Sequence, residues 1–179
     1  MNASTTPPKR EVGDGRGRFF EDFTVGQVIQ HPLGRTVTTN DNMWFTHLTL
    51  NPNPIHFDHV YAAHTEWGKP LVNSVFTLAL VTGLSVDDLS RNGVNLGWDK
   101  VRLPHPLFEG DTVYARSEVL SARASKSRPQ QGIVGFRTQG YQQDGVVVIE
   151  YERTVLVYRF DGAPPRPAPP PIASEEVGS

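Results

Sequence analysis

Alternating apolar and polar positions in the second half of the chain predict a long antiparallel sheet. The longest run, residues 146–160, has one largely apolar face and one face that carries charge, a period of two that is typical of a strand packed on one side. Shorter strand candidates lie at residues 98–103, 112–120 and 133–141, and an Asp-Gly pair at 144–145 suits a tight hairpin turn. The apolar face of the longest run consists of Val147, Ile149, Tyr151, Val155 and Val157.

A different pattern predicts a central helix within residues 73–90. From Val75 to Val81 only one residue, a threonine, is polar, so a helix here has no polar side. A helix that is apolar on every side has to be buried, and a buried helix needs a sheet around it. Asn73 or Ser74 is placed to cap its first turn.

Two shorter helices and a loop between them are expected upstream. Residues 41–50 suit a helix capped by one of the polar residues at 38–40, and residues 59–65 suit a helix capped by Asp58. Residues 51–58 contain two Asn-Pro steps, and because a residue before proline is disfavoured in a helix, we expect an irregular loop. A long antiparallel sheet curved over one buried helix is an α+β architecture.

One domain with two tails accounts for this pattern. Residues 1–17 are polar and Gly-rich, and residues 161–179 are dominated by proline. We expect both segments to be tails around a single domain of residues 18–160, which is long enough to bury one hydrophobic core.

Composition narrows the functional classes. With 17 Lys and Arg against 19 Asp and Glu the net charge is −2, which gives no bulk attraction for nucleic acid. No apolar run reaches the roughly 18 residues that a membrane span needs, and the N-terminus lacks the apolar core of a signal peptide, so we expect a cytoplasmic protein without a membrane partner. The chain has no cysteine, and among its six histidines only His56 and His59 have the spacing of a metal-binding pair, so we expect no disulfide and no metal cofactor.

The predicted loop carries a recognisable motif. Residues 51–58 are NPNPIHFD, Tyr61-Ala62 follow, and residues 67–74 are WGKPLVNS. In this spacing residues 38–76 resemble the MaoC-like family of (R)-specific enoyl-CoA hydratases and dehydratases, whose motif is an acidic residue, any residue, Asn-Pro, any residue, His, any residue, Asp. Further on, PLFEGD at 106–111 is similar to a strand-opening turn of that family, and SKSRPQQGIV at 125–134 is similar to the subgroup that acts on itaconyl-CoA or mesaconyl-CoA.

The resemblance implies a hot-dog fold and a lyase that adds water reversibly to the 2,3 double bond of an acyl-CoA thioester. It implies no cofactor beyond the coenzyme A of the substrate. His56 is then the base that takes the proton of water, because an imidazole with a pKa near ~6.5 accepts a proton at neutral pH. Asn53 holds the loop or the water, and the start of the central helix at Asn73 and Ser74 offers backbone N–H groups, of which that of Ser74 stabilises the thioester oxygen.

One position departs from the family motif, because the acidic catalytic residue is Asn51 here. Asparagine cannot take a proton, although its amide can still orient water by hydrogen bonding. We therefore expect a site centred on His56 in which Asn51 orients and does not ionise. The alternative is a relative that binds acyl-CoA without reaction.

Other candidates each have an ordinary structural interpretation. Lys126 and Arg128, with Arg123 and Arg137 nearby, suit the phosphates of coenzyme A, although most such clusters are solvated surface. His47 is either a substitute base or a surface histidine. Thr82 either lines the pocket or bonds within its own helix, and Asp41 and Asp58 suit helix caps better than acids.

Two further expectations complete the sequence hypothesis. An open sheet edge predicts that two copies join into a homodimer or a higher homo-oligomer with the acyl-CoA tunnel across the interface. A hot-dog thioesterase remains an alternative function, distinguished by the release of free thiol.

Overall fold

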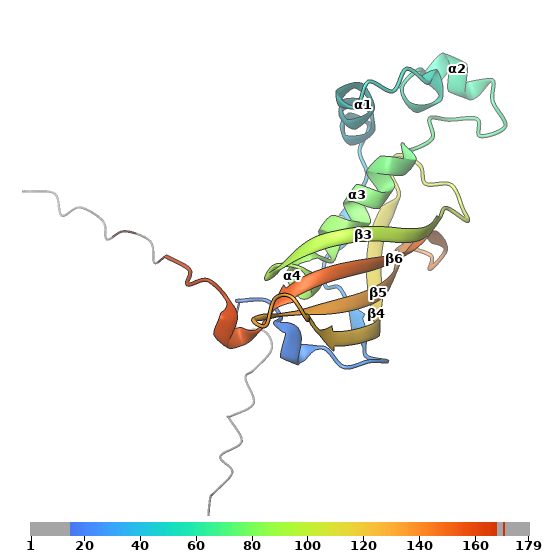
Figure 1. Cartoon of the computed structure of the whole chain (residues 1–179). Helices are drawn as coiled ribbons and strands as arrows, with labels where there is room; N and C mark the ends of the chain where they lie inside the picture. The colour runs from blue at the N-terminus through green and yellow to red at the C-terminus, as the bar shows by residue number, and fades with distance from the viewer. Residues whose placement is uncertain (1–14, 168–169, 171–179) are drawn as a thin grey trace, which may run out of the picture.

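The computed structural model describes residues 15–167 and residue 170. Its main element is one antiparallel sheet with the strand order β1-β4-β5-β6-β3, in which β2 also pairs with β4. Helix α3 (Ser74–Leu84) lies along one face of this sheet (Figure 1). The strands are β1 (Val28–Gln30), β2 (Arg35–Thr36), β3 (Gly93–Arg102), β4 (Thr112–Ala124), β5 (Gln131–Gln142) and β6 (Val147–Tyr158).

All four predicted strands are present, and the architecture is the predicted α+β arrangement. β3 begins at Gly93, five residues before the predicted start, and the short strands β1 and β2 were not predicted. Helices α1 (Thr39–Leu48) and α2 (His59–Ala63) lie beyond one end of the sheet (Figure 1). The remaining elements are α4 (Val86–Leu89) and the 3-10 turns η1 (Phe20–Asp22), η2 (Pro54–His56) and η3 (Phe160–Gly162).

Polar side chains fix where the helices begin. Thr38 and Asp41 form a capping box at the start of α1, in which each side chain accepts a hydrogen bond from the other residue's backbone N–H. The Asp58 carboxylate accepts from the N–H of Tyr61 and so caps α2. Asn73 caps α3 through the N–H groups of its first turn. The cap predicted for each of these helices is confirmed.

Helix α3 is buried on the side that faces the sheet. Val81 is fully buried, and a Cβ atom added to Gly140 of β5 would lie 2.5 Å from a methyl carbon of Val81, so the helix touches the strand there. On the opposite side Val75 is 59% exposed, and Ala79 and Gly83 are exposed as well. The expected burial of this helix on every side is therefore met only on its sheet side within one chain.

The core consists of two apolar clusters with a polar layer between them. Along β4, β5 and β6 the polar layer is formed by Ser117, Thr138 and Arg153, each of which is at most 2% exposed. One cluster surrounds α3 and includes Val81, Val113, Ala115, Ile149 and Tyr151. The other includes Ile29, Val119, Val134, Phe136, Val155 and Val157.

His31 lies in this polar layer and is buried. Its Nδ1–H donates to the Asp88 carboxylate over 2.8 Å, and its Nε2 lies 2.9 Å from the Ser117 hydroxyl, which in turn lies 2.8 Å from the hydroxyl of Thr138. Burial lowers the pKa of the His31 ring below its ordinary value and outweighs the opposing effect of the Asp88 carboxylate. The ring is therefore neutral at pH 7, and its Nε2 accepts a hydrogen bond from the Ser117 hydroxyl.

Both ends of the chain contact the domain where the structure describes them. The carbonyl oxygen of Arg16 accepts hydrogen bonds from the side chains of Asn92 and Arg166, both at 2.8 Å. The remainder of the two predicted tails, at positions 1–14, 168–169 and 171–179, lies outside the described residues. None of the helices in the described ranges is long and apolar enough to cross a membrane.

Candidate active site

Asparagine side chains shape the loop that carries the candidate base. Asn51 Oδ1 accepts from the N–H of Asn53 over 3.0 Å, and Asn53 Oδ1 accepts from the N–H of Ile55 over 3.3 Å. These side-chain-to-backbone hydrogen bonds close short turns in a segment where the two prolines disfavour a helix. They lead into η2, at whose end His56 is only 8% exposed.

The His56 ring is held in one orientation. Its Nδ1 lies 2.8 Å from the carbonyl oxygen of Leu71, and because a carbonyl can only accept, Nδ1 carries the proton. The lone pair of the neutral ring then lies on Nε2. The sequence hypothesis requires such a lone pair, because a general base must have a free acceptor nitrogen.

Asn42 connects the histidine loop to the central helix. It is fully buried in α1, and its amide Nδ2 donates to the carbonyl oxygens of His56 at 2.8 Å and Leu71 at 3.2 Å, and to a carboxylate oxygen of Glu109 at 3.1 Å. Its Oδ1 accepts from the backbone N–H of Asn73 over 2.9 Å. The sequence analysis missed this residue, because its partners lie up to 67 positions away along the chain.

The start of α3 is arranged as the sequence predicted. Asn73 Oδ1 accepts from the N–H groups of Val75 and Phe76, and its Nδ2 donates to the Thr46 hydroxyl at 3.2 Å. The Asn73 side chain thus caps α3 and also bonds to α1, and the residue is only 3% exposed. Ser74 is exposed, and as the first residue of α3 its N–H has no partner within the helix.

A cavity of about 230 Å³ lies at this helix end. Trp67, Leu71, Val72, Ser74 and Thr77 line one part of it, and the loop 103–107 with Val148 lines the rest. His56 and Asn51 are not among the lining residues. Leu71 connects His56 to the cavity, because it lines the cavity and its carbonyl oxygen accepts the hydrogen bond that holds the His56 ring.

His105 is a polar lining residue that the sequence analysis did not single out. Its Nδ1–H donates to the carbonyl oxygen of Val147 over 2.9 Å, so Nε2 is the nitrogen left for a ligand. Near the cavity, the Phe108 ring lies 6.5 Å from the ring of Trp67, and Lys69 places its ammonium group 4.2 Å from the Phe108 ring centre. No lining residue is acidic.

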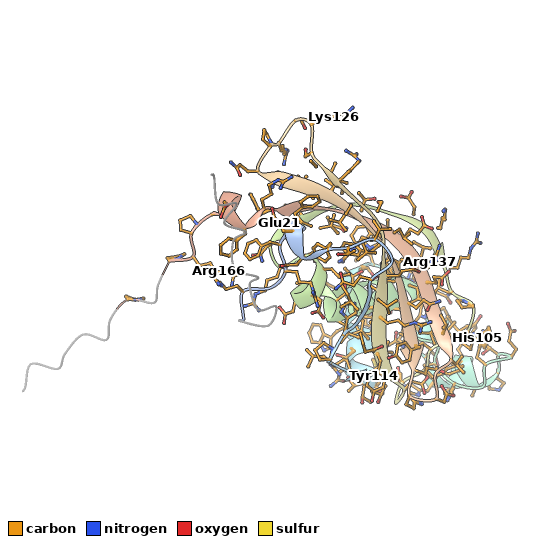
Figure 2. The ribbon with its side chains drawn as sticks, turned by 90° about the horizontal axis from the view of Figure 1, so that it is seen from below. Glu21, His105, Tyr114, Lys126, Arg137 and Arg166 are labelled. Atoms are coloured by element: carbon orange, nitrogen blue, oxygen red, sulfur yellow. The ribbon has the colours of Figure 1, made fainter. Side chains whose placement is uncertain are left out.

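The basic cluster is not part of this cavity. Lys126 and Arg128 lie in the hairpin between β4 and β5, and Figure 2 shows Lys126 at one end of the molecule and His105 near the other. Arg137 is paired with Glu118 and Glu152 on the sheet. One chain therefore does not bring the predicted phosphate-binding residues near the predicted base.

The remaining candidates have structural roles. His47 is exposed and its ring contacts Phe57, with 4.8 Å between the ring centres. The Thr82 hydroxyl is directed to the sheet, where it lies 3.2 Å from the hydroxyl of Tyr151. Within the described part of the chain no group of three or more His, Cys, Asp or Glu side chains is placed to hold a metal.

Comparison with solved structures defines the class. A MaoC-like dehydratase from Rhodospirillum rubrum superposes with a TM-score of 0.71 at 28% identity, over 85% of this chain and all of that one. A Mycobacterium tuberculosis protein with a double hot-dog fold superposes with a TM-score of 0.74 at 23% identity, over 84% of this chain and 47% of that one. The sheet and central helix are thus those of a hot-dog fold, and the fold is shared with this MaoC-like dehydratase.

Sequence comparison narrows the class to a family. Residues 6–164 match the family model described as mesaconyl-CoA hydratase. The mesaconyl-CoA hydratase of Cereibacter sphaeroides is 34% identical over 166 residues, which are 91% of this chain and 48% of that protein. The chain belongs to the mesaconyl-CoA hydratase family. It spans about half the length of the curated relatives that share this name.

Proposed function

We infer that the protein catalyses the reversible hydration of a short 2-enoyl-CoA to the 3-hydroxyacyl-CoA, as a hydro-lyase. One observation carries this conclusion. The His56 ring is held by the carbonyl oxygen of Leu71 with Nε2 free, and Leu71 lines the same cavity as Ser74 at the start of α3. Addition of water to a conjugated thioester requires a base and an N–H donor, and Leu71 connects the two here, because it holds the His56 ring and lines the cavity beside Ser74.

The reaction proceeds by proton transfer and electrostatic stabilisation. His56 Nε2 takes a proton from water while the water oxygen bonds to carbon 3 of the acyl group. Negative charge moves to the thioester oxygen, where the N–H of Ser74 at the positive end of α3 stabilises it. The proton then passes from His56 to carbon 2, so that one water is added and the ring returns to its neutral form.

Asn51 and Asn53 support this chemistry without ionising. The Asn51 side-chain oxygen is already used by the N–H of Asn53, so its amide hydrogens are the groups left to orient water or substrate. A loop that lacked both His56 and an acidic residue would have no side chain to transfer a proton, so such a protein could only bind its ligand. With His56 present, one ionisable residue is sufficient for a proton-transfer effect of about 10²- to 10⁴-fold.

The cavity favours a short acyl group. Its volume of about 230 Å³ lies below the roughly 300–1,000 Å³ of typical small-molecule pockets. Its wall has no acidic residue and includes His105, which is compatible with a second carboxylate on the acyl group. Relatives are described as mesaconyl-CoA hydratase and β-methylmalyl-CoA dehydratase. We propose a small branched or dicarboxylic enoyl group, such as mesaconyl or itaconyl, with coenzyme A as part of the substrate and no other cofactor.

The working form that we propose is a homodimer or a higher homo-oligomer. β3 is an edge strand, and α3 has an open side, so one chain leaves the rim of the site uncovered. A partner on this edge would exclude water from the cavity, which strengthens the electrostatic stabilisation of the enolate.

A spectrophotometric assay tests the function against its alternatives. Mesaconyl-, itaconyl- and crotonyl-CoA are each incubated with the protein while the conjugated enoyl absorbance and free thiol are followed together. Hydration lowers the absorbance without thiol release. Release of thiol instead identifies a thioesterase, and tight binding with neither change identifies a non-catalytic acyl-CoA-binding protein.

A further inference from the structure

The cavity wall contains an ionisable side chain that the proposed proton transfer does not use. Most of the residues that line the cavity are apolar, and the polar ones are Trp67, Ser74, Thr77 and His105. Tryptophan, serine and threonine do not ionise near neutral pH, whereas histidine does. Among the lining residues in the described part of the chain, His105 is therefore the one whose side chain can carry a charge.

The backbone around His105 restricts where its ring can lie. The residue stands between Pro104 and Pro106, and the second proline disfavours a helical conformation at His105. The side-chain amide of Gln142 donates to the carbonyl oxygen of Pro106 over 3.3 Å and so ties the loop to β5. The ring itself donates from Nδ1 to the carbonyl oxygen of Val147 over 2.9 Å. Because the loop and the ring are held before a ligand arrives, less conformational freedom is lost when one binds.

The Nε2 atom of this ring can pair with a negatively charged group. The residue is exposed, so a ligand that enters the cavity can reach it. Since Nδ1 donates to a carbonyl, Nε2 accepts a hydrogen bond in the neutral ring and donates one in the protonated ring. A carboxylate can only accept, so it pairs with the protonated ring in a charge-assisted hydrogen bond. The described residues that line the facing walls, on α3, on β6 and in segment 67–72, are not ionisable, so none of them competes for this bond.

The two ends of a short dicarboxylic acyl group match two walls of the cavity. Ser74, the proposed donor to the thioester oxygen, lies on α3, and His105 lies in the loop after β3. In a four-carbon dicarboxylic enoyl group the terminal carboxylate is attached to carbon 3, which is the carbon that water attacks. The water oxygen gains negative charge as His56 takes its proton, so a carboxylate at this carbon repels it. A cation that binds the carboxylate offsets this repulsion, whereas a methyl group at the same place needs no such partner.

We propose that His105 binds the terminal carboxylate of a dicarboxylic enoyl-CoA and so selects this substrate over an enoyl-CoA of the same length that ends in a methyl group. The assignment rests on the hydratase function proposed above and names the residue that determines substrate choice within it. His56 remains the base for both kinds of substrate. A hydrogen bond between charged groups contributes a preference on the order of 10- to 10²-fold.

Fumaryl-CoA and crotonyl-CoA test this selection, because their acyl groups differ in a terminal carboxylate against a methyl group. The quantity measured is the ratio of kcat/KM for fumaryl-CoA to kcat/KM for crotonyl-CoA. We expect His105→Phe to lower this ratio at least about 10-fold, chiefly through a higher KM for fumaryl-CoA, because the charged hydrogen bond is lost. His105→Gln, whose amide can still donate a hydrogen bond, should recover part of the preference, and it provides the test if the phenylalanine variant does not fold.

The pH dependence of the same ratio separates charge from shape. As pH rises, the His105 ring loses its proton, and a neutral Nε2 no longer donates to a carboxylate. The wild-type ratio should therefore fall as pH rises through the titration of this ring. His56 titrates in both reactions, so its effect on the two kcat/KM values cancels. In His105→Phe and in His105→Gln the ratio should be independent of pH between roughly 6 and 9.

Two matched variants serve as controls. The ammonium group of Lys69 lies 4.2 Å from the Phe108 ring centre, but Lys69 does not line the cavity, so Lys69→Met should leave the ratio unchanged. His64 is exposed and also bonds a carbonyl oxygen through Nδ1, so His64→Phe controls for the substitution itself.

Three results would overturn the assignment of His105. They are an unchanged ratio in His105→Phe, an equal decrease in Lys69→Met, and a wild-type protein that hydrates crotonyl-CoA but not fumaryl-CoA. A wild-type protein that hydrates neither of these thioesters, nor mesaconyl-CoA, refutes the hydratase function itself.

Discussion

The Nδ1–H of His56 donates to the carbonyl oxygen of Leu71 over 2.8 Å. This bond fixes the tautomer, since a backbone carbonyl offers no proton, and directs the basic lone pair to Nε2. Asn42 Nδ2 donates to the same carbonyl oxygen and to that of His56. The orientation of the base is thus set by the backbone of the segment that leads into α3.

Replacing His56, the proposed base, should abolish the proposed hydration. We expect His56→Ala to lower kcat by at least about 10²-fold while the far-UV circular dichroism spectrum stays unchanged, because proton transfer by a positioned imidazole contributes about that much. His64→Ala is the matched control, since the exposed His64 ring also donates from Nδ1 to a carbonyl oxygen, that of Val60 at 2.7 Å. Wild-type turnover in the His56 variant would refute the mechanism.

A carboxylate at position 51 adds a second ionisable group. We expect Asn51→Asp to fold normally, because a carboxylate oxygen also accepts the N–H of Asn53. Turnover should equal or exceed that of the wild type, and the pH–rate profile should gain a second limb at acidic pH. Asn51→Leu, which removes the turn bond, should lose activity. A loss of more than about 10-fold in the aspartate variant would show that the amide hydrogens of Asn51 are required and would contradict the expectation that a carboxylate can replace them.

Asn42 holds the site together, so its removal affects stability and rate. Asn42→Ala leaves the buried carbonyl oxygens of His56 and Leu71 and the N–H of Asn73 without this partner. We expect the free energy of unfolding to fall by about 2–4 kcal/mol, since each unsatisfied buried group costs about 1–3 kcal/mol. Urea denaturation measures the change. Asn40→Ala, an exposed neighbour in α1, should change stability by less than about 1 kcal/mol.

The buried His31 makes stability depend on pH. Its folded-state pKa is lowered by burial, so below its ordinary value near ~6.5 the unfolded chain binds a proton that the folded chain does not. This histidine therefore contributes a decrease in the free energy of unfolding as pH falls from 7.5 towards its folded pKa. Urea denaturation at several pH values measures the slope, and NMR titration follows the protonation of the His31 ring. A His31 ring that takes up its proton at or above the ordinary pKa of ~6.5 contradicts the assignment.

Much of the fold could be predicted because it depends on residues that are close together in the sequence. The three helix starts at α1, α2 and α3 follow from side chains within three residues of each helix, namely Thr38, Asp58 and Asn73. The alternation in β6 likewise follows from neighbouring positions in one strand. The histidine loop was predictable because its turns depend on prolines and asparagines inside the loop itself.

Features that depend on distant contacts were not predictable. Asn42 was indistinguishable from a surface residue of a short helix, because its importance comes from His56, Leu71 and Glu109. His105 enters the cavity wall only when the loop after β3 meets the start of α3. The apolar pattern of α3 predicted burial on all sides, yet one chain covers only one of them, since apolar residues mark interfaces between chains as well as cores.

The close packing of Val81 against Gly140 has a consequence for the shape of the cavity. Gly140, in the middle of β5, has no side chain, so α3 packs directly against the strand at this point. Any larger residue would push the helix away from the sheet. Since Ser74 and Thr77 belong to the same helix two turns and one turn before Val81, raising it would displace both of them relative to Val148 and the loop 103–107, which line the rest of the cavity. The shape of the cavity therefore depends on the absence of a side chain at a strand position that does not line it.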